Sequence, residues 1–199
     1  MKKSQDVVFY ILSFTWGCIM SFIGLIGAIV LLLTKHKPKI FHRRLYFEVG
    51  ENWGGVNLGP IFLVSKNSGL STKLHECGHG LQNAILGPVM PFIVCIPSAI
   101  RYWLYDSAEK ERTFLYLLSF IFVPIAMLLV SILFLIGQHF IGFFILFAPI
   151  VYLIAIDFWL IVFESKNYFK KPFPEYDSIW FEKSATTLGN KYFQEEIEE

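Results

Sequence analysis

Long apolar runs separated by short polar segments dominate this sequence. Val7 to Leu33 contains about 27 residues without a charged side chain, which as a helix is long enough to cross the ~30 Å hydrocarbon core of a bilayer. Two further runs, Phe114 to Ile136 and Phe140 to Phe163, are separated by only a short polar link. This pattern predicts an N-terminal transmembrane helix followed later by a transmembrane hairpin.

A fourth apolar stretch, Ile85 to Trp103, is interrupted by Pro88, Pro91 and Pro97. Because each proline removes a backbone donor, the stretch is typical of a re-entrant or interfacial segment rather than a regular span. The composition agrees with a membrane environment, since 55% of the 199 residues are hydrophobic and 18% are aromatic. The predicted fold class is therefore mainly α, a multi-pass helical integral membrane protein.

Two strand-prone runs lie between the first apolar run and the prolines. They are Tyr46 to Val49 and Ile61 to Val64, and the segment 50–60 between them is dense in glycine, asparagine and proline. Such runs around a turn-forming segment predict a small β-hairpin or three-strand meander. Ser71 or Thr72 can then cap the start of the next helix.

These elements predict four regions along the chain. They are an N-terminal transmembrane helix (1–34), a region with the β-meander, a motif-bearing helix and the re-entrant segment (35–113), the transmembrane hairpin (114–163) and a tail (164–199). Lysine and arginine concentrate in the second and fourth regions, and the positive-inside rule therefore places both in the cytoplasm. The net charge is only +1, so no nucleic-acid partner is predicted.

The motif H-E-x-x-H, formed by His75, Glu76 and His79, is the strongest chemical signal in the chain. On a helix the two histidines share a face, where both imidazoles can bind one zinc ion (Zn2+). Glu76 can then accept a proton from water as that water attacks a carbonyl. The motif predicts hydrolysis, although the same letters also occur on solvated helix faces.

A catalytic zinc site normally takes a third protein ligand. Ile85 stands where a metzincin-type motif would place a third histidine. Asp157 lies within the last apolar run, where an ionisable side chain is costly and often functional. Glu182 lies in a short polar helix after that run, and a two-span hairpin would return it to the side of the motif. The topology thus favours Glu182 and leaves Asp157 open.

The segment 74–83, Leu-His-Glu-Cys-Gly-His-Gly-Leu-Gln-Asn, is followed by Leu-Gly-Pro at 86–88. It resembles a group of bacterial membrane proteins that share an H-E-x-G-H-x-x-Q…G-P core behind a Gly-rich stretch. More distantly, it is similar to the integral-membrane gluzincins, the CAAX-processing and HtpX-type zinc proteases. The resemblance implies a multi-pass protein of the bacterial cytoplasmic membrane.

In those zinc proteases a glutamate from a later helix, within an E-x-x-A-D-like pattern, completes the site. Glu182 begins the matching sequence Glu-Lys-Ser-Ala, and Thr186 stands in place of the usual aspartate. The resemblance therefore implies that His75, His79 and Glu182 bind zinc and that Glu76 is the general base.

Four functions remain open at this stage. The favoured one is a membrane-bound zinc metallopeptidase with a cytoplasm-facing site beside the lipid bilayer. Its substrate would be a peptide or protein, including one associated with the membrane. A site-2-protease-like intramembrane peptidase would use Asp157 as third ligand, but the Asp-Gly of those enzymes is absent. A non-catalytic scaffold is the third function, and Thr186 in place of the usual aspartate is the feature that supports it. A metal transporter is disfavoured because no internal repeat is visible.

Overall fold

The computed structural model describes residues 3–109 and 176–194 throughout. Between these ranges it describes residues 125, 128–129, 131–133, 135–137, 141–142, 147–156 and 158–159. The chain divides into two compact units, Met1–Val94 with Glu175–Glu199, and Cys95–Pro174. The H-E-x-x-H motif and Glu182 both belong to the first unit, whereas the second begins with helix α4 (Ile96–Glu109).

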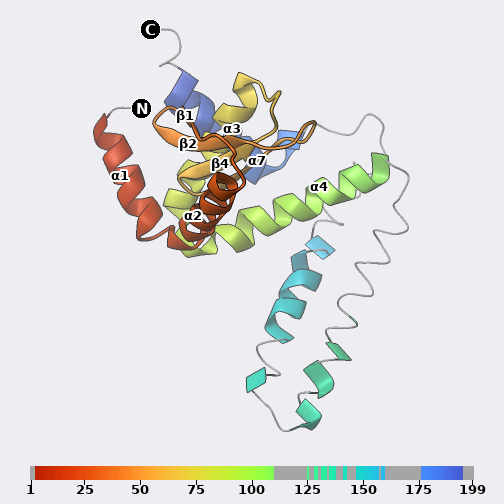
Figure 1. Ribbon diagram of the computed structural model, residues 1–199. Helices are drawn as coiled ribbons and strands as arrows, with labels where there is room; N and C mark the ends of the chain where they lie inside the picture. Colours follow the sequence, from red (N-terminus) through yellow and green to blue (C-terminus); the bar gives the residue numbers. More distant parts are fainter. Residues whose placement is uncertain are drawn as a thin grey trace. The chain divides into compact units, whose positions relative to one another are not determined.

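The first unit packs helices around a small mixed sheet (Figure 1). Its strands lie in the order β1-β2-β4-β3. The helices are α1 (Lys3–Phe14), α2 (Cys18–Leu33), α3 (Leu70–Leu86) and α7 (Trp180–Gly189), and the strands are β1 (Lys39–Phe41), β2 (Arg44–Glu48), β3 (Gly55–Leu58) and β4 (Ile61–Val64).

Two tight turns and one crossover build the sheet. β1 and β2 are antiparallel and joined by His42 and Arg43, which have φ values of 45° and 62°. Positive φ at both central residues gives a turn whose twist matches that of the strands. β3 and β4 are antiparallel across Gly59-Pro60, whereas β2 and β4 are parallel. A parallel pair requires a crossover, which here contains the loop after β2 and strand β3.

The predicted hairpin between the two strand-prone runs is wrong. Both runs form strands, but they pair in parallel, with Leu45 opposite Ile61. The segment 50–60 contains β3, which takes the antiparallel position beside β4. The predicted three-strand meander is wrong as well, because β4 and not β3 lies beside β2. Gly55 in β3 weakens the strand signal, and it is required because a Cβ atom there would lie 2.5 Å from Glu76 Oε1.

The predicted fold class of helical integral membrane protein is contradicted. Among the residues that the structure describes, no single helix is both long and apolar enough to cross a membrane. The run from Val7 to Leu33 forms α1 and α2, which are bent by 91° relative to each other. Asn83 Nδ2 donates to the Gly17 carbonyl at this bend over 3.2 Å, and a side chain at Gly17 would overlap Asn83. Hydropathy records composition alone and does not detect such a bend.

Two bent helix pairs do have a sufficient length and composition, namely Ser4–Phe14 with Cys18–Leu33 and Leu70–Val89 with Pro91–Trp103. The second pair contains the proline-interrupted stretch of the sequence. The predicted hairpin lies largely outside the described residues, although these include a short apolar helix, Phe147–Ile156. Asp157 also lies outside them.

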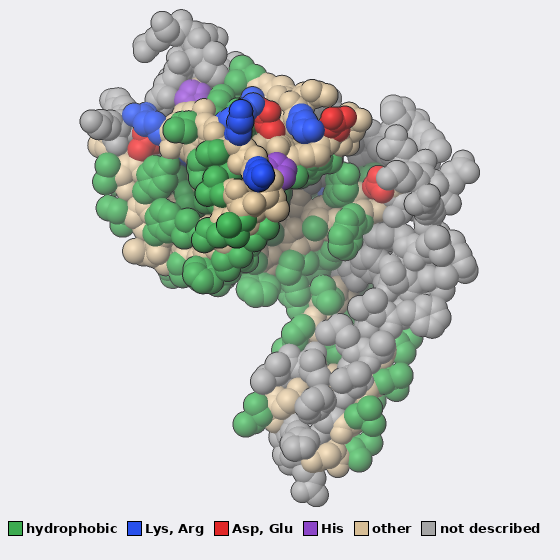
Figure 2. Space-filling model, in the orientation of Figure 1, with side chains coloured by type: hydrophobic (Ala, Val, Ile, Leu, Met, Phe, Trp, Pro, Cys, Tyr) green, Lys and Arg blue, Asp and Glu red, His purple; other side chains and the backbone are tan. Residues whose placement is uncertain are grey.

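Helix α2 packs one face on the sheet and exposes the other. Its buried residues are Met20, Ser21, Gly24 and Ala28. Figure 2 shows hydrophobic side chains across the surface over α1 and α2, whereas charged side chains gather elsewhere on this face. The exposed residues of this apolar face include Val7, Ile11, Phe22, Ile26, Ile29 and Leu33. Contiguous exposed apolar surface of this kind marks an interaction site.

Helices α3 and α7 approach each other backbone to backbone. A Cβ atom at Gly78 of α3 would overlap the carbonyl of Ala185 in α7, and one at Gly189 of α7 would overlap the carbonyl of Leu74 in α3. Glycine at both positions therefore sets how closely the helix that carries Glu182 approaches the motif. The loss of helix propensity at Gly78, about 1 kcal/mol, is offset by this contact.

The substitution Gly78→Ala tests this packing. Because the added methyl meets main chain of α7 rather than a flexible side chain, we expect the free energy of unfolding to fall by about 3 kcal/mol. Chemical denaturation of the purified protein measures it. Gly54→Ala is the matched control, since nothing lies within 4 Å of a Cβ atom there. Equal stability of the two variants would contradict the close approach of the helices.

Candidate metal centre

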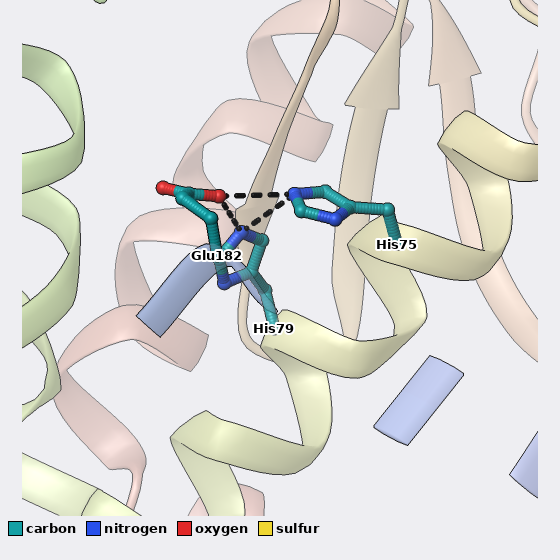
Figure 3. Close-up of side chains that lie close together, drawn as sticks. All are labelled: His75, His79 and Glu182. Carbon is teal, nitrogen blue, oxygen red and sulfur yellow. Dashed lines mark hydrogen bonds and ion pairs between the residues drawn. The ribbon is translucent and has the colours of Figure 1, made fainter. Parts of the chain in front are cut away.

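Two imidazoles and a carboxylate converge between α3 and α7 (Figure 3). His75 and His79 lie one turn apart on α3, and their Nε2 atoms are 3.0 Å from each other. Glu182 Oε2 from α7 lies 3.1 Å from His75 Nε2 and 3.2 Å from His79 Nε2. Three atoms that can each donate an electron pair thus form a nearly equilateral triangle.

The dimensions of this triangle suit a zinc ion. Zinc binds histidine nitrogen and carboxylate oxygen at about 2.0–2.2 Å in a tetrahedral arrangement, which separates neighbouring ligand atoms by about 3.3 Å. The observed separations of 3.0, 3.1 and 3.2 Å differ from that value by a few tenths of an ångström. His75, His79 and Glu182 therefore form a group that could hold a metal ion, with one tetrahedral position left for water or substrate.

Each histidine has a second partner behind the triangle. His75 Nδ1 lies 2.8 Å from Thr186 Oγ1, and His79 Nδ1 lies 2.7 Å from Gln82 Oε1. Such contacts fix the orientation of a metal-binding imidazole. Thr186, which replaces the expected aspartate, thus still contacts His75, although as a neutral hydroxyl.

Glu76 is buried beside the triangle, against β3. Its Oε2 atom has no hydrogen-bond partner among the described residues, and Asn57 Nδ2 donates to its main-chain carbonyl over 2.9 Å. Burial raises the pKa of the Glu76 carboxyl to about 8, with a smaller lowering from His75 and a smaller raising from Glu182. A cation bound at the triangle would lower this pKa. An unpaired buried carboxyl is costly, and it suits a site that binds a metal and a water.

Cys77 faces away from the metal centre. It is buried in an apolar cluster with Tyr46, Phe62 and Leu74, and burial raises the pKa of its thiol to about 12. A thiol with so high a pKa is neither a metal ligand nor a nucleophile near pH 7.

The structure brings together His75, His79 and Glu182, and it places Glu76 beside them. Sequence reasoning did not assign roles to Gln82 or to the strand β3 that covers Glu76. The position of Gln82, three residues after His79, was the available signal, because residues three apart share a helix face. No regular sequence spacing links β3 to the H-E-x-x-H motif, so the contact of β3 with Glu76 had no signal in the sequence.

Comparisons of this chain with protein-family models, with curated proteins and with solved structures found no match. The function must therefore be argued from the geometry of the site.

Replacing the carboxylate tests the metal centre. Glu182→Gln removes the only charged ligand of the three, so we expect zinc affinity to fall by more than about 100-fold. That is a larger loss than the one usually caused by replacing a residue that only hydrogen-bonds to a ligand. Competition with a chromophoric chelator measures the affinity. Glu51→Gln is the control, because Glu51 is exposed and paired with Lys66. Unchanged affinity in Glu182→Gln would exclude Glu182 as a ligand.

Proposed function

We propose that this protein is a zinc-dependent metallopeptidase. The observation that carries the proposal is the triangle of His75, His79 and Glu182 with a buried carboxyl, Glu76, directly beside it. When bound in such a site, zinc lowers the pKa of a coordinated water toward about 7 and polarises a carbonyl oxygen. The resemblance to gluzincin-like membrane proteases is consistent with this arrangement of two histidines, a later glutamate and a motif glutamate.

Metal binding and proton transfer are assigned to different residues of the site. His75, His79 and Glu182 would hold the ion. Glu76 accepts a proton from the attacking water as its oxygen bonds to the peptide carbonyl carbon, and then delivers that proton to the amide nitrogen as the C–N bond breaks. The products are a carboxylic acid and an amine. Burial raises the pKa of the Glu76 carboxyl above its usual value, and a bound cation would lower it again, so that the carboxylate could accept the proton.

The alternative functions have less support. The scaffold hypothesis rested on Thr186, yet the Thr186 hydroxyl lies 2.8 Å from His75 Nδ1 and so contacts one of the three residues of the triangle. The site-2-protease-like hypothesis needs Asp157 as third ligand, whereas Glu182 already supplies a third ligand atom.

Loss of the base tests the catalytic part of the proposal. Glu76→Gln removes the proton acceptor without removing a metal ligand, so we expect peptide cleavage to fall by about 10²–10⁴-fold while zinc affinity stays within a few-fold of wild type. Mass spectrometry of a complex peptide mixture measures new amino termini, with Glu51→Gln as control. Full cleavage by Glu76→Gln would contradict the assigned role.

The exposed apolar face over α1 and α2 suggests where in the cell this protein would act. We propose that this face lies against a lipid surface, with α2 parallel to it. The chain immediately after α2 carries Lys35 and Lys37, which would meet anionic headgroups while the apolar side chains enter the acyl region.

Vesicle flotation tests this surface. Phe22, Ile26 and Ile29 share the exposed side of α2, and replacing all three by serine should weaken binding to vesicles that contain anionic phospholipid more than tenfold, because each buried apolar side chain contributes about 1.5–3 kcal/mol. Val56→Ser, an exposed apolar position on β3, should leave binding unchanged. Equal flotation of wild type and triple variant would contradict the proposal.

A further inference from the structure

Gln82 occupies the buried space between α3 and the start of α7. Its side chain is 4% exposed, and its amide contacts three groups. Nε2 donates to the Phe181 carbonyl over 2.7 Å and to Ser184 Oγ over 2.5 Å, whereas Oε1 lies 2.7 Å from His79 Nδ1. Two of these groups flank the ligand Glu182 in sequence, and the third belongs to the ligand His79.

These contacts determine the positions of the nitrogen and the oxygen in the Gln82 side-chain amide. The Phe181 carbonyl can only accept a hydrogen bond, so the amide nitrogen of Gln82 must face it. The amide oxygen then faces His79, and because that oxygen can also only accept, His79 Nδ1 must carry the proton. In this tautomer the electron pair of the imidazole is on Nε2, the atom that lies 3.2 Å from Glu182 Oε2.

Thr186 does not impose the same constraint on His75. Its hydroxyl can donate or accept, so the 2.8 Å contact with His75 Nδ1 is compatible with either tautomer. Control of the tautomer in this site therefore resides on the His79 side.

We propose that Gln82 is a positioning residue of the metal centre, which holds His79 as the Nδ1–H tautomer and couples that tautomer to the docking of α7. The inference rests on the proposed zinc site for its functional meaning. A single side chain thus relates the orientation of one ligand to the placement of another. When α7 is docked, the Phe181 carbonyl orients the amide, and the amide orients the imidazole.

Two substitutions separate positioning of the imidazole from docking of the helix. Gln82→Met keeps a side chain of similar length but removes every hydrogen bond. Gln82→Glu keeps an oxygen that accepts from His79 Nδ1, but a carboxylate cannot donate to the Phe181 carbonyl. If Gln82 served only to dock α7, both variants would have the same effect on the metal centre.

The tautomer is read in the metal-free full-length protein from the ¹⁵N chemical shifts of His79. We expect wild type and Gln82→Glu to show the Nδ1–H form and Gln82→Met to show a mixture. Zinc affinity should fall about 10–100-fold in Gln82→Met and less in Gln82→Glu. Thr187→Ala is the control, since the exposed Thr187 hydroxyl donates to the Lys183 carbonyl within α7 and takes no part in the contacts of Gln82, and it should behave as wild type.

A wild-type His79 protonated on Nε2, or an Nδ1–H form retained in Gln82→Met, would overturn the inference. So would equal zinc affinities in Gln82→Met and Gln82→Glu. Absence of zinc binding by wild type would instead refute the proposed metal centre. The tautomer measurement still decides on Gln82 in that case, because it is made without metal.

Discussion

The close contact between α3 and α7 is the constraint on which the functional centre depends. Glu182 lies 103 residues from His79 along the chain, and it reaches the histidines because glycine at 78 and 189 lets two backbones meet. Any side chain at either position would overlap main chain of the facing helix and would move Glu182 away from the imidazoles. Packing at two glycines thus decides whether three ligand atoms form one site.

That packing also places two carboxyl groups in a region that excludes water. Glu182 is fully buried and Glu76 nearly so, and the charge of Glu182 adds to the effect of burial in raising the pKa of Glu76. A divalent cation would offset both the burial and the repulsion. Metal binding would therefore be linked to stability, since an ion that binds only the folded state stabilises it. Gln82 and Thr186 are neutral, so a zinc ion held with Glu182 as the one carboxylate ligand would keep a charge of +1, which would favour an electrophilic role.

Local patterns in the sequence were sufficient to predict the parts of the structure that depend on local spacing. The motif helix and strands β2 and β4 follow from hydrophobic periodicity and from residue type. The parallel pairing of β2 with β4, the strand hidden in segment 50–60 and the bend at Gly17 depend on contacts between distant residues. A hydropathy window contains no information about Asn83 bonding to Gly17, so it merged two helices into one predicted span. Glu182 was predicted from its resemblance to a family pattern, whereas Gln82 was passed over because its hydrogen bonds become apparent only when α7 is in place.

X-ray absorption spectroscopy at the zinc edge of the full-length, zinc-loaded protein tests the central claim most directly. A centre built from His75, His79 and Glu182 predicts a first shell of nitrogen and oxygen at about 2.0–2.2 Å, with the scattering pattern of two imidazoles and no sulfur. A zinc–sulfur distance near 2.3 Å, or a single imidazole in the first shell, would contradict the assignment of these three residues as the metal centre.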